Sequence, residues 1–368
     1  MMENKRLLSL DTLRGFDMLF ISGLVGVLGA ICNLLPCGSD CWLMHQMEHA
    51  EWNGMFHHDT IFPLFLFIAG ISFPFSYAKQ VEKGRTRRQI YRKIFYRGFM
   101  LAVLGIVYNG LCDLHLDTIR IHSVLGRIGF AWMFAALIFI NTKNVRPRLI
   151  ISSAILIGYW LLLRFVPAPD APGADPFSFE GNLVGYIDRM LIPNHILIPG
   201  KFDNEGLLSV LPAIVTAMLG MLTGDYVKNG THSGSRKTLN MLLASLLMLG
   251  AGLLWGLVFP INKSLWSSSF VLVVGAYSMA MFALFYWIID VKGWKKWTKF
   301  FEVVGLNSIA IYFINRIGMV WGIRWFFFGG IIEHLPESVH ELGLELTYFF
   351  TAWFIVWVLY KLKIFIKI

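Results

Sequence analysis

The chain has 368 residues, of which 56% are hydrophobic and only 15% are charged. A soluble globular protein is about one quarter charged, so this composition excludes that class and indicates long apolar segments. The net charge of +9 comes from Lys and Arg residues that are scattered over short loops. Nucleic-acid binding would require those charges on one folded face, whereas membrane proteins carry such a bias in their cytoplasmic loops. The composition therefore predicts an all-α polytopic membrane protein.

The apolar runs approach the ~20 residues that a helix needs to cross a bilayer. They predict a bundle of about ten transmembrane helices, at about residues 12–35, 60–78, 95–111, 122–140, 149–166, 206–224, 239–259, 267–290, 300–319 and 345–364. The segment 321–332 is also apolar but is short for a full span. We therefore expect it to be a re-entrant or interfacial piece.

The distribution of basic residues predicts the orientation of the bundle. Segment 79–97 carries the densest run of Lys and Arg in the chain, and the loop 36–58 contains neither residue. Cytoplasmic loops are enriched in Lys and Arg, so loops 36–58 and 167–205 are expected outside, and both termini in the cytoplasm. Cys37 and Cys41 lie in the first of these external loops, where a disulfide is chemically permitted. We predict a single transmembrane domain over residues 1–368.

The most unusual stretch of the chain is 47–63, which holds three His, three carboxylates, an Asn and a Trp between two apolar runs. His49 can exchange a proton near neutral pH or act as a nucleophile. If the stretch is helical, Trp52 and Asn53 share the face of His49. Asp59 is well placed to cap the second span. Imidazole and carboxylate also suit zinc, but no recognised ligand pattern accompanies them, and we predict no metal.

Polar residues inside or beside other spans are further candidates for functional groups. Asp11 and Arg14 are three residues apart and can pair on one helix face. Arg127 lies within an apolar span, where a charge normally lines a cavity or meets a partner, and a guanidinium suits phosphate. The remaining candidates are Arg120 and His122 before that span, Asn262, Lys263 and Trp266 at the end of another, and Asn307 inside the ninth.

Six stretches of the chain, taken together, resemble the ordered motifs of a known protein family. They are residues 9–15, the His-Ala-Glu-Trp-Asn-Gly sequence at 49–54 with 59–63, and residues 120–127, 205–208, 260–266 and 305–308. Each is weakly specific, but their order resembles the transmembrane acyltransferase family of heparan-α-glucosaminide N-acetyltransferases and their bacterial relatives. Where that family carries an Asn in the outer part of the first span, this chain has Ser22, which could take its place.

The resemblance implies transfer of an acetyl group from cytoplasmic acetyl-CoA to the amine of a glucosamine-type sugar on the other side of a bacterial cytoplasmic membrane. The catalytic His of the family corresponds to His49, as general base or transient acetyl carrier, with Asn53 assisting. We expect the acceptor near Trp52, Glu51, Asp59, Asn262, Lys263, Trp266 and Asn307, and the phosphates of acetyl-CoA near Asp11, Arg14, Arg127 and His122.

Two other functions stay open at this point. The same fold could acetylate a hydroxyl of a surface glycan or lipid, or the chain could be a solute transporter without covalent chemistry. The expected partners are acetyl-CoA, an amino-sugar or glycan acceptor and the lipid bilayer, and no nucleic acid. Whether the protein forms a homodimer is open.

Overall fold

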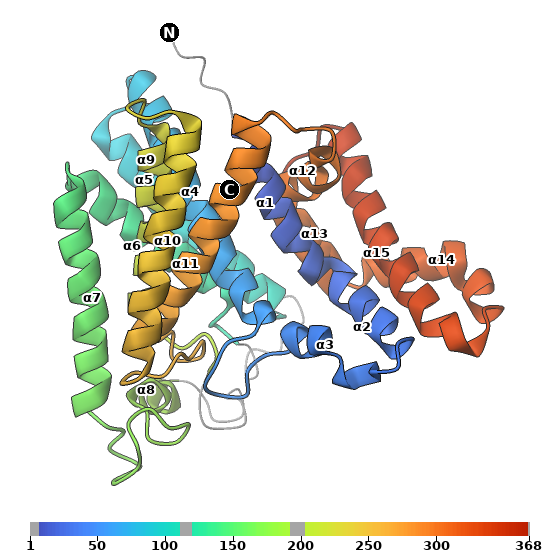
Figure 1. Ribbon diagram of the computed structural model, residues 1–368, viewed down its shortest axis with the longest axis horizontal. Helices are drawn as coiled ribbons and strands as arrows, with labels where there is room; N and C mark the ends of the chain where they lie inside the picture. The colour runs from blue at the N-terminus through green and yellow to red at the C-terminus, as the bar shows by residue number, and fades with distance from the viewer. Residues whose placement is uncertain (1–6, 111–119, 192–202, 367–368) are drawn as a thin grey trace. The chain divides into compact units, whose positions relative to one another are not determined.

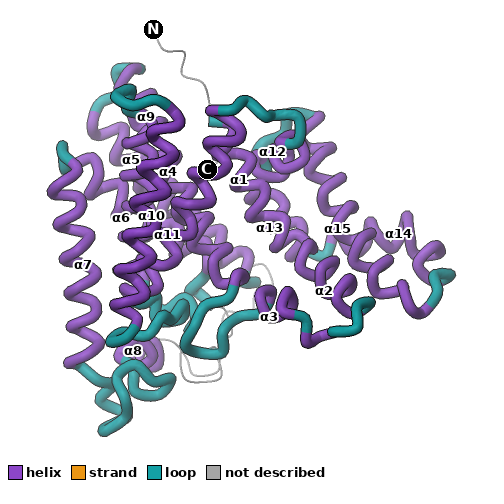
Figure 2. Tube along the Cα trace, viewed as in Figure 1, coloured by secondary structure: helices purple, strands orange, loops and turns teal. Residues whose placement is uncertain are grey.

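The computed structural model describes residues 7–110, 120–191 and 203–366 (Figure 1). Within these ranges every regular element is a helix and no strand is present (Figure 2). The predicted all-α fold is therefore confirmed for the described residues. The chain divides into two compact units, and it passes from one to the other after His49, Met55, Ile61 and Ala280.

The first unit contains the first and the last described helices of the chain. Its amino-terminal helices are α1 (Leu8–Leu19), the π-helical turn η1 (Phe20–Leu24), α2 (Val25–Asn33) and α3 (Trp42–Met47). The short helix η3 (His57–Thr60) belongs to it as well. Its carboxyl-terminal part comprises η6 (Tyr286–Val291), α12 (Thr298–Leu306), α13 (Ser308–Arg316), α14 (Met319–Glu333) and α15 (Glu337–Lys361).

Close backbone contact joins α1 to α12 in this unit. A Cβ atom on Gly15 would overlap the carbonyl oxygen of Phe301, and one on Gly305 would overlap the carbonyl oxygen of Asp11. The two helices can therefore approach this closely only because both positions are glycine. At η1 the first span departs from helical geometry, and Gly23 has a φ of +108°, which favours glycine.

The second unit is built from α4 (Ile61–Glu82), α5 (Arg87–Tyr108), α6 (Val124–Asn141), α7 (Val145–Phe165), α8 (Leu183–Leu191), α9 (Val210–Lys228), α10 (Gly234–Gly256) and most of α11 (Ser268–Phe285). Small residues again set the packing, because a Cβ on Gly220 in α9 would overlap the carbonyl oxygen of Phe67 in α4. Capping side chains begin the helices: Thr86 and Gln89 form a capping box at α5, and Ser123 accepts from the Gly126 N–H at α6.

Among the described residues, eight helical segments are long and apolar enough to cross a membrane, which supports a multi-pass membrane protein. They are Leu8–Asn33, His57–Glu82, Val124–Asn141, Val145–Phe165, Val210–Lys228, Gly234–Gly256, Ser268–Val291 and Glu337–Lys361. Each coincides with a span expected from the sequence. The count of ten spans and the cytoplasmic position of the termini stay predictions.

The third and the ninth expected spans differ from their predicted residue ranges. The third is α5, which begins eight residues earlier than expected, so that its first turns carry the basic residues 87–97, whereas Lys79, Lys83 and Arg85 precede it. The ninth is divided at Asn307 into α12 and α13, because that buried residue has a non-helical conformation with φ −121° and ψ 31°. The apolar segment 321–332 lies in α14, a helix of 15 residues.

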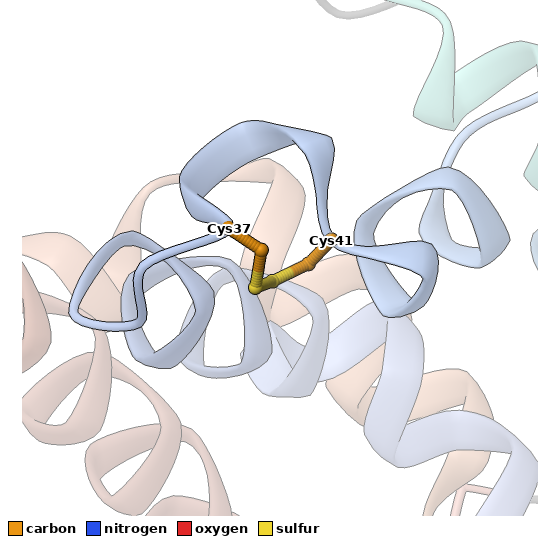
Figure 3. Close-up of a disulfide and its surroundings, with 2 residues drawn as sticks. All are labelled: Cys37 and Cys41. Carbon is orange, nitrogen blue, oxygen red and sulfur yellow. A yellow bond between two sulfur atoms is a disulfide. The ribbon is translucent and has the colours of Figure 1, made fainter.

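The loop before the polar stretch 47–63 is closed by a disulfide between Cys37 and Cys41 (Figure 3). The two Cα atoms are 5.0 Å apart, and a 3-10 turn at Gly38–Asp40 separates them. The permitted bond is therefore formed, and it closes a short loop within the connection between α2 and α3.

Candidate functional site

His49 is held by a buried carboxylate. Its Nδ1 lies 2.7 Å from Oδ1 of Asp59, and both residues belong to the first unit. The Asp59 side chain is only 2% exposed, whereas the His49 side chain is 57% exposed. An ionised carboxylate can only accept, so Nδ1 carries the proton and donates it to Asp59. This arrangement assigns Nε2 as the ring nitrogen that would accept a proton from a substrate.

Asp59 combines two roles that the sequence analysis did not join. Its Oδ2 accepts from the backbone N–H of Phe56 at 3.1 Å, which caps the short helix at His57, while Oδ1 receives the His49 ring. The sequence predicts that Asp59 caps the second span; its carboxylate instead lies at the third position of η3, the short helix that precedes α4, and accepts from the N-cap residue Phe56. The neighbouring His58 ring packs edge-on against His49 with ring centroids 4.5 Å apart. These contacts fix the orientation of the exposed imidazole.

The loop 50–55 belongs to the second unit and is not helical, so the conditional helix over His49, Trp52 and Asn53 is not formed. Gly54 has a φ of +110°, and its N–H donates to the Ile261 carbonyl at 2.8 Å. Asn262 lies beside this contact and is fully buried, and its Nδ2 donates to Oδ1 of Asn53 at 3.2 Å. Asn53 and Asn262, two candidate residues far apart in the sequence, are therefore joined by a hydrogen bond.

Trp52 anchors the same loop. Its indole N–H donates to the Phe177 carbonyl at 2.9 Å, and its ring meets that of Phe179 edge-on at 5.1 Å. Glu51 is exposed beside it, and Lys263 is partly buried in the loop that holds Asn262. The indole N–H is thus occupied by protein, so this side chain contributes its ring face and the position of the loop.

Arg127 is one of the most deeply placed charges of the second unit, with 3% exposure. Its guanidinium donates to the Asn204 carbonyl at 2.8 Å and to the Ser209 hydroxyl at 2.6 Å. It also lies over the ring of Trp266, 4.9 Å from the centroid, and that indole is itself buried. The contacts join α6, the segment before α9 and the loop of Asn262. The two hydrogen bonds use Nη2, whereas the buried Nε has no hydrogen-bond partner among the described residues, and the expected phosphate contact of Arg127 stays a prediction.

The sequence did not predict how a group of charged residues in the second unit pairs. Arg120 pairs with Asp203 and Glu205, and Asp203 donates its N–H to a carboxylate oxygen of Asp188. Burial lowers the pKa of His122. The Asp203 carboxylate raises that pKa, and the cations Arg127 and Arg120 lower it further. The available signal was the pair of acids Asp203 and Glu205, but their partner Arg120 is 83 and 85 residues away in the sequence, so spacing could not predict the contact.

Burial also raises the pKa of the Asp188 carboxyl to about 6, with the neighbouring Asp203 charge acting in the same direction. Asp188 is 1% exposed and lies in α8, outside the candidate spans. Its carboxyl lies against Gly206, where a side chain would collide with it. This acid therefore helps to close the segment that holds Arg127.

The remaining candidates lie in the first unit. Asp11 and Arg14 form the ion pair that their spacing indicated, with Nη1 3.3 Å from Oδ1. Asn307 is fully buried at the break between α12 and α13, and neither side-chain polar atom has a partner among the described residues. Ser22 is 2% exposed, and its hydroxyl donates to the Met18 carbonyl at 2.7 Å, so it serves the irregular turn of the first span.

Comparison with known proteins identifies relatives of the whole chain. Human heparan-alpha-glucosaminide N-acetyltransferase is 28% identical over 423 aligned residues, which cover 99% of this chain and 60% of the human protein. The mouse enzyme of the same name is 28% identical over 378 residues, covering 87% of this chain and 56% of the mouse protein. The chain thus spans somewhat less than two thirds of the length of these relatives. No protein-family model matches it. The similarity agrees with the ordered motifs and supports a heparan-alpha-glucosaminide N-acetyltransferase-like family for this chain.

Proposed function

We propose that the protein transfers an acetyl group from acetyl-CoA to the amine of a glucosamine-type sugar, with His49 as the general base. The observation that carries the proposal is the contact between exposed His49 and buried Asp59. It lies in a stretch that resembles the acyltransferase motif, within a chain that is similar throughout to two N-acetyltransferases. A proton carrier held by a fixed carboxylate is what aminolysis of a thioester requires.

The reaction balances with one shuttled proton. The amine nitrogen attacks the thioester carbonyl carbon, a C–N bond forms, and Nε2 of His49 takes a proton from that nitrogen. The C–S bond then breaks, and the imidazolium returns the proton to the departing thiolate. The products are the N-acetyl sugar and the free thiol, and His49 is regenerated. Transient acetylation of the same ring is the alternative course, and it uses the same nitrogen.

Other candidate residues have roles that follow from their contacts. Asn53, Glu51 and Lys263 are proposed for the acceptor, since sugar hydroxyls bind to amides and charged side chains. Arg14 is proposed for the acetyl-CoA phosphates, with Asp11 orienting its guanidinium through their ion pair. Arg127 is proposed to position Trp266 and the loop of Asn262, because its Nη2 donates to Asn204 and Ser209 and its guanidinium lies over the Trp266 ring. The acceptor is proposed on the side of the disulfide, since such bonds persist outside the cytoplasm.

Acetyl transfer tests the proposal directly. Purified protein in detergent is given radiolabelled acetyl-CoA and glucosamine, and labelled N-acetylglucosamine is measured. We expect His49→Ala to lower kcat by roughly 10²- to 10⁴-fold, the usual contribution of a general base. His45→Ala is the matched control, because His45 is an exposed His in the same unit. Undiminished turnover by His49→Ala would exclude this role, and transfer to N-blocked sugars would indicate acetylation of a hydroxyl instead.

A further inference from the structure

A basic pocket lies at the beginning of α5, away from the residues assigned above. It has a volume of about 350 Å³ and is lined by Arg85, Gln89, Arg92, Lys93 and Tyr96. Three of these five side chains are cations, and all five are exposed to solvent. The pocket is built from one helix and the residue pair before it, so its shape belongs wholly to the second unit.

The cations of this pocket are not neutralised within the protein. Among the residues that the structure describes, none of Arg85, Arg92 and Lys93 forms an ion pair with a carboxylate. The charges repel one another at this spacing, and an exposed cluster of like charges is stabilised by an anion. Guanidinium and ammonium groups together suit a phosphate ester, the first as a planar fork and the second as a point charge.

An exposed apolar track continues from the pocket down the same helix face. Tyr96, Phe99 and Val103 follow Arg92 at intervals of four, three and four residues, and they are 59%, 54% and 49% exposed. Residues at this spacing lie above one another on a helix. The opposite face of α5 packs on α6, where a Cβ on Gly129 would lie 2.6 Å from the Gly98 carbonyl oxygen. The ring of Phe99 meets that of Phe130 in α6 edge-on, with centroids 5.8 Å apart, and the track otherwise lies on the exposed side of α5.

We propose that this pocket and track bind an anionic phospholipid, with its phosphate among Arg85, Arg92 and Lys93 and an acyl chain along Tyr96, Phe99 and Val103. The position of the cations next to exposed apolar side chains favours a phospholipid over a soluble anion. A soluble nucleotide would use the cations alone, and the track would then contact only the general lipid of the bilayer. A phospholipid places charge and hydrocarbon next to each other along one helix axis, and clusters of basic residues beside a span bind such headgroups.

The experiment measures lipid binding to the full-length protein. Detergent-purified protein is titrated with phosphatidylglycerol and, separately, with phosphatidylcholine, and bound lipid is quantified by native mass spectrometry. Binding of acetyl-CoA is measured on the same samples by calorimetry. The variants are Arg92→Gln with Lys93→Gln, Phe99→Ala, and the control pair Lys295→Gln with Lys296→Gln, which removes two exposed lysines from a different loop.

Each cation near an anionic headgroup contributes about fivefold in affinity, equivalent to about 1 kcal/mol. The Arg92/Lys93 pair is therefore expected to weaken phosphatidylglycerol binding about 25-fold and to leave acetyl-CoA binding unchanged. Phe99→Ala should weaken both lipids, because it removes contact with the chain. Wild-type lipid affinity in the Arg92/Lys93 variant would overturn the proposal. So would an equal loss in the control pair, which indicates diffuse attraction, or a loss confined to acetyl-CoA, which indicates a nucleotide site.

Discussion

Replacing Asp59 with Asn tests how His49 is oriented. The carboxylate has two acceptor oxygens in use, one for His49 Nδ1 at 2.7 Å and one for the Phe56 N–H at 3.1 Å. An amide has a single acceptor oxygen. If that oxygen keeps the Phe56 cap, the amide N–H faces Nδ1 and favours the tautomer with the proton on Nε2. Such a ring cannot accept a proton from the substrate.

The structure sets the size of the expected effect. A hydrogen bond to a charged group contributes about 1.5–3 kcal/mol, which corresponds to roughly 10- to 150-fold in rate. The tautomer change adds to this loss, because only the minor form of the ring remains active. We therefore expect Asp59→Asn to lower kcat by about 10²-fold or more with a small change in KM. The buried position of the carboxylate makes solvent an ineffective substitute.

The assay is the acetyl-transfer measurement, with thermal unfolding recorded on the same preparations. Glu48→Gln is the matched control, because that carboxylate is adjacent to His49 in sequence but 58% exposed. It should keep the wild-type rate. If Asp59→Asn folds as the wild type does and turns over at the same rate, then the His49 contact has no role in catalysis and the reasoning fails.

Three further predictions follow from the contacts of the second unit. Asn262→Ala should lower the free energy of unfolding by about 2 kcal/mol and raise KM for the sugar, because it removes the buried amide that holds Asn53. An unchanged denaturant unfolding curve would contradict this prediction. Arg127→Lys should lower the unfolding temperature and leave KM for acetyl-CoA unchanged. The reason is that a Lys cannot stack on Trp266 and also reach both acceptors. A raised KM for acetyl-CoA with unaltered stability would instead indicate that Arg127 binds phosphate. Asp188, with its pKa raised to about 6, binds its proton more tightly in the folded protein. Its contribution is therefore complete below about pH 4 and is lost as the pH rises through about 6, a change of about 3 kcal/mol. Asp188→Asn should abolish that part of the pH dependence in unfolding measured from about pH 4 to 7, and parallel profiles for the two proteins would refute it.

The sequence alone predicted the helical membrane fold because its information is local. A run of apolar residues near the length of a bilayer is sufficient to indicate a span, and eight such runs recur as long apolar helices. His49 also stood out without coordinates, since few residues carry protons near neutral pH and one His lay inside a motif that resembles a known family. The disulfide required only that two nearby cysteines share a loop.

The tertiary structure decided how those residues work. Asp59 lies ten residues from His49, so only the path of the loop could show that its carboxylate both caps a helix and orients the ring. Arg127 has donors suited to phosphate, but Asn204, Ser209 and Trp266 surround it from segments 77 to 139 residues away. A charged side chain has the same chemistry wherever it lies, and its role depends on which acceptors the fold brings within reach. Sequence spacing can place a residue on a helix face, but it cannot specify the partner across the bundle.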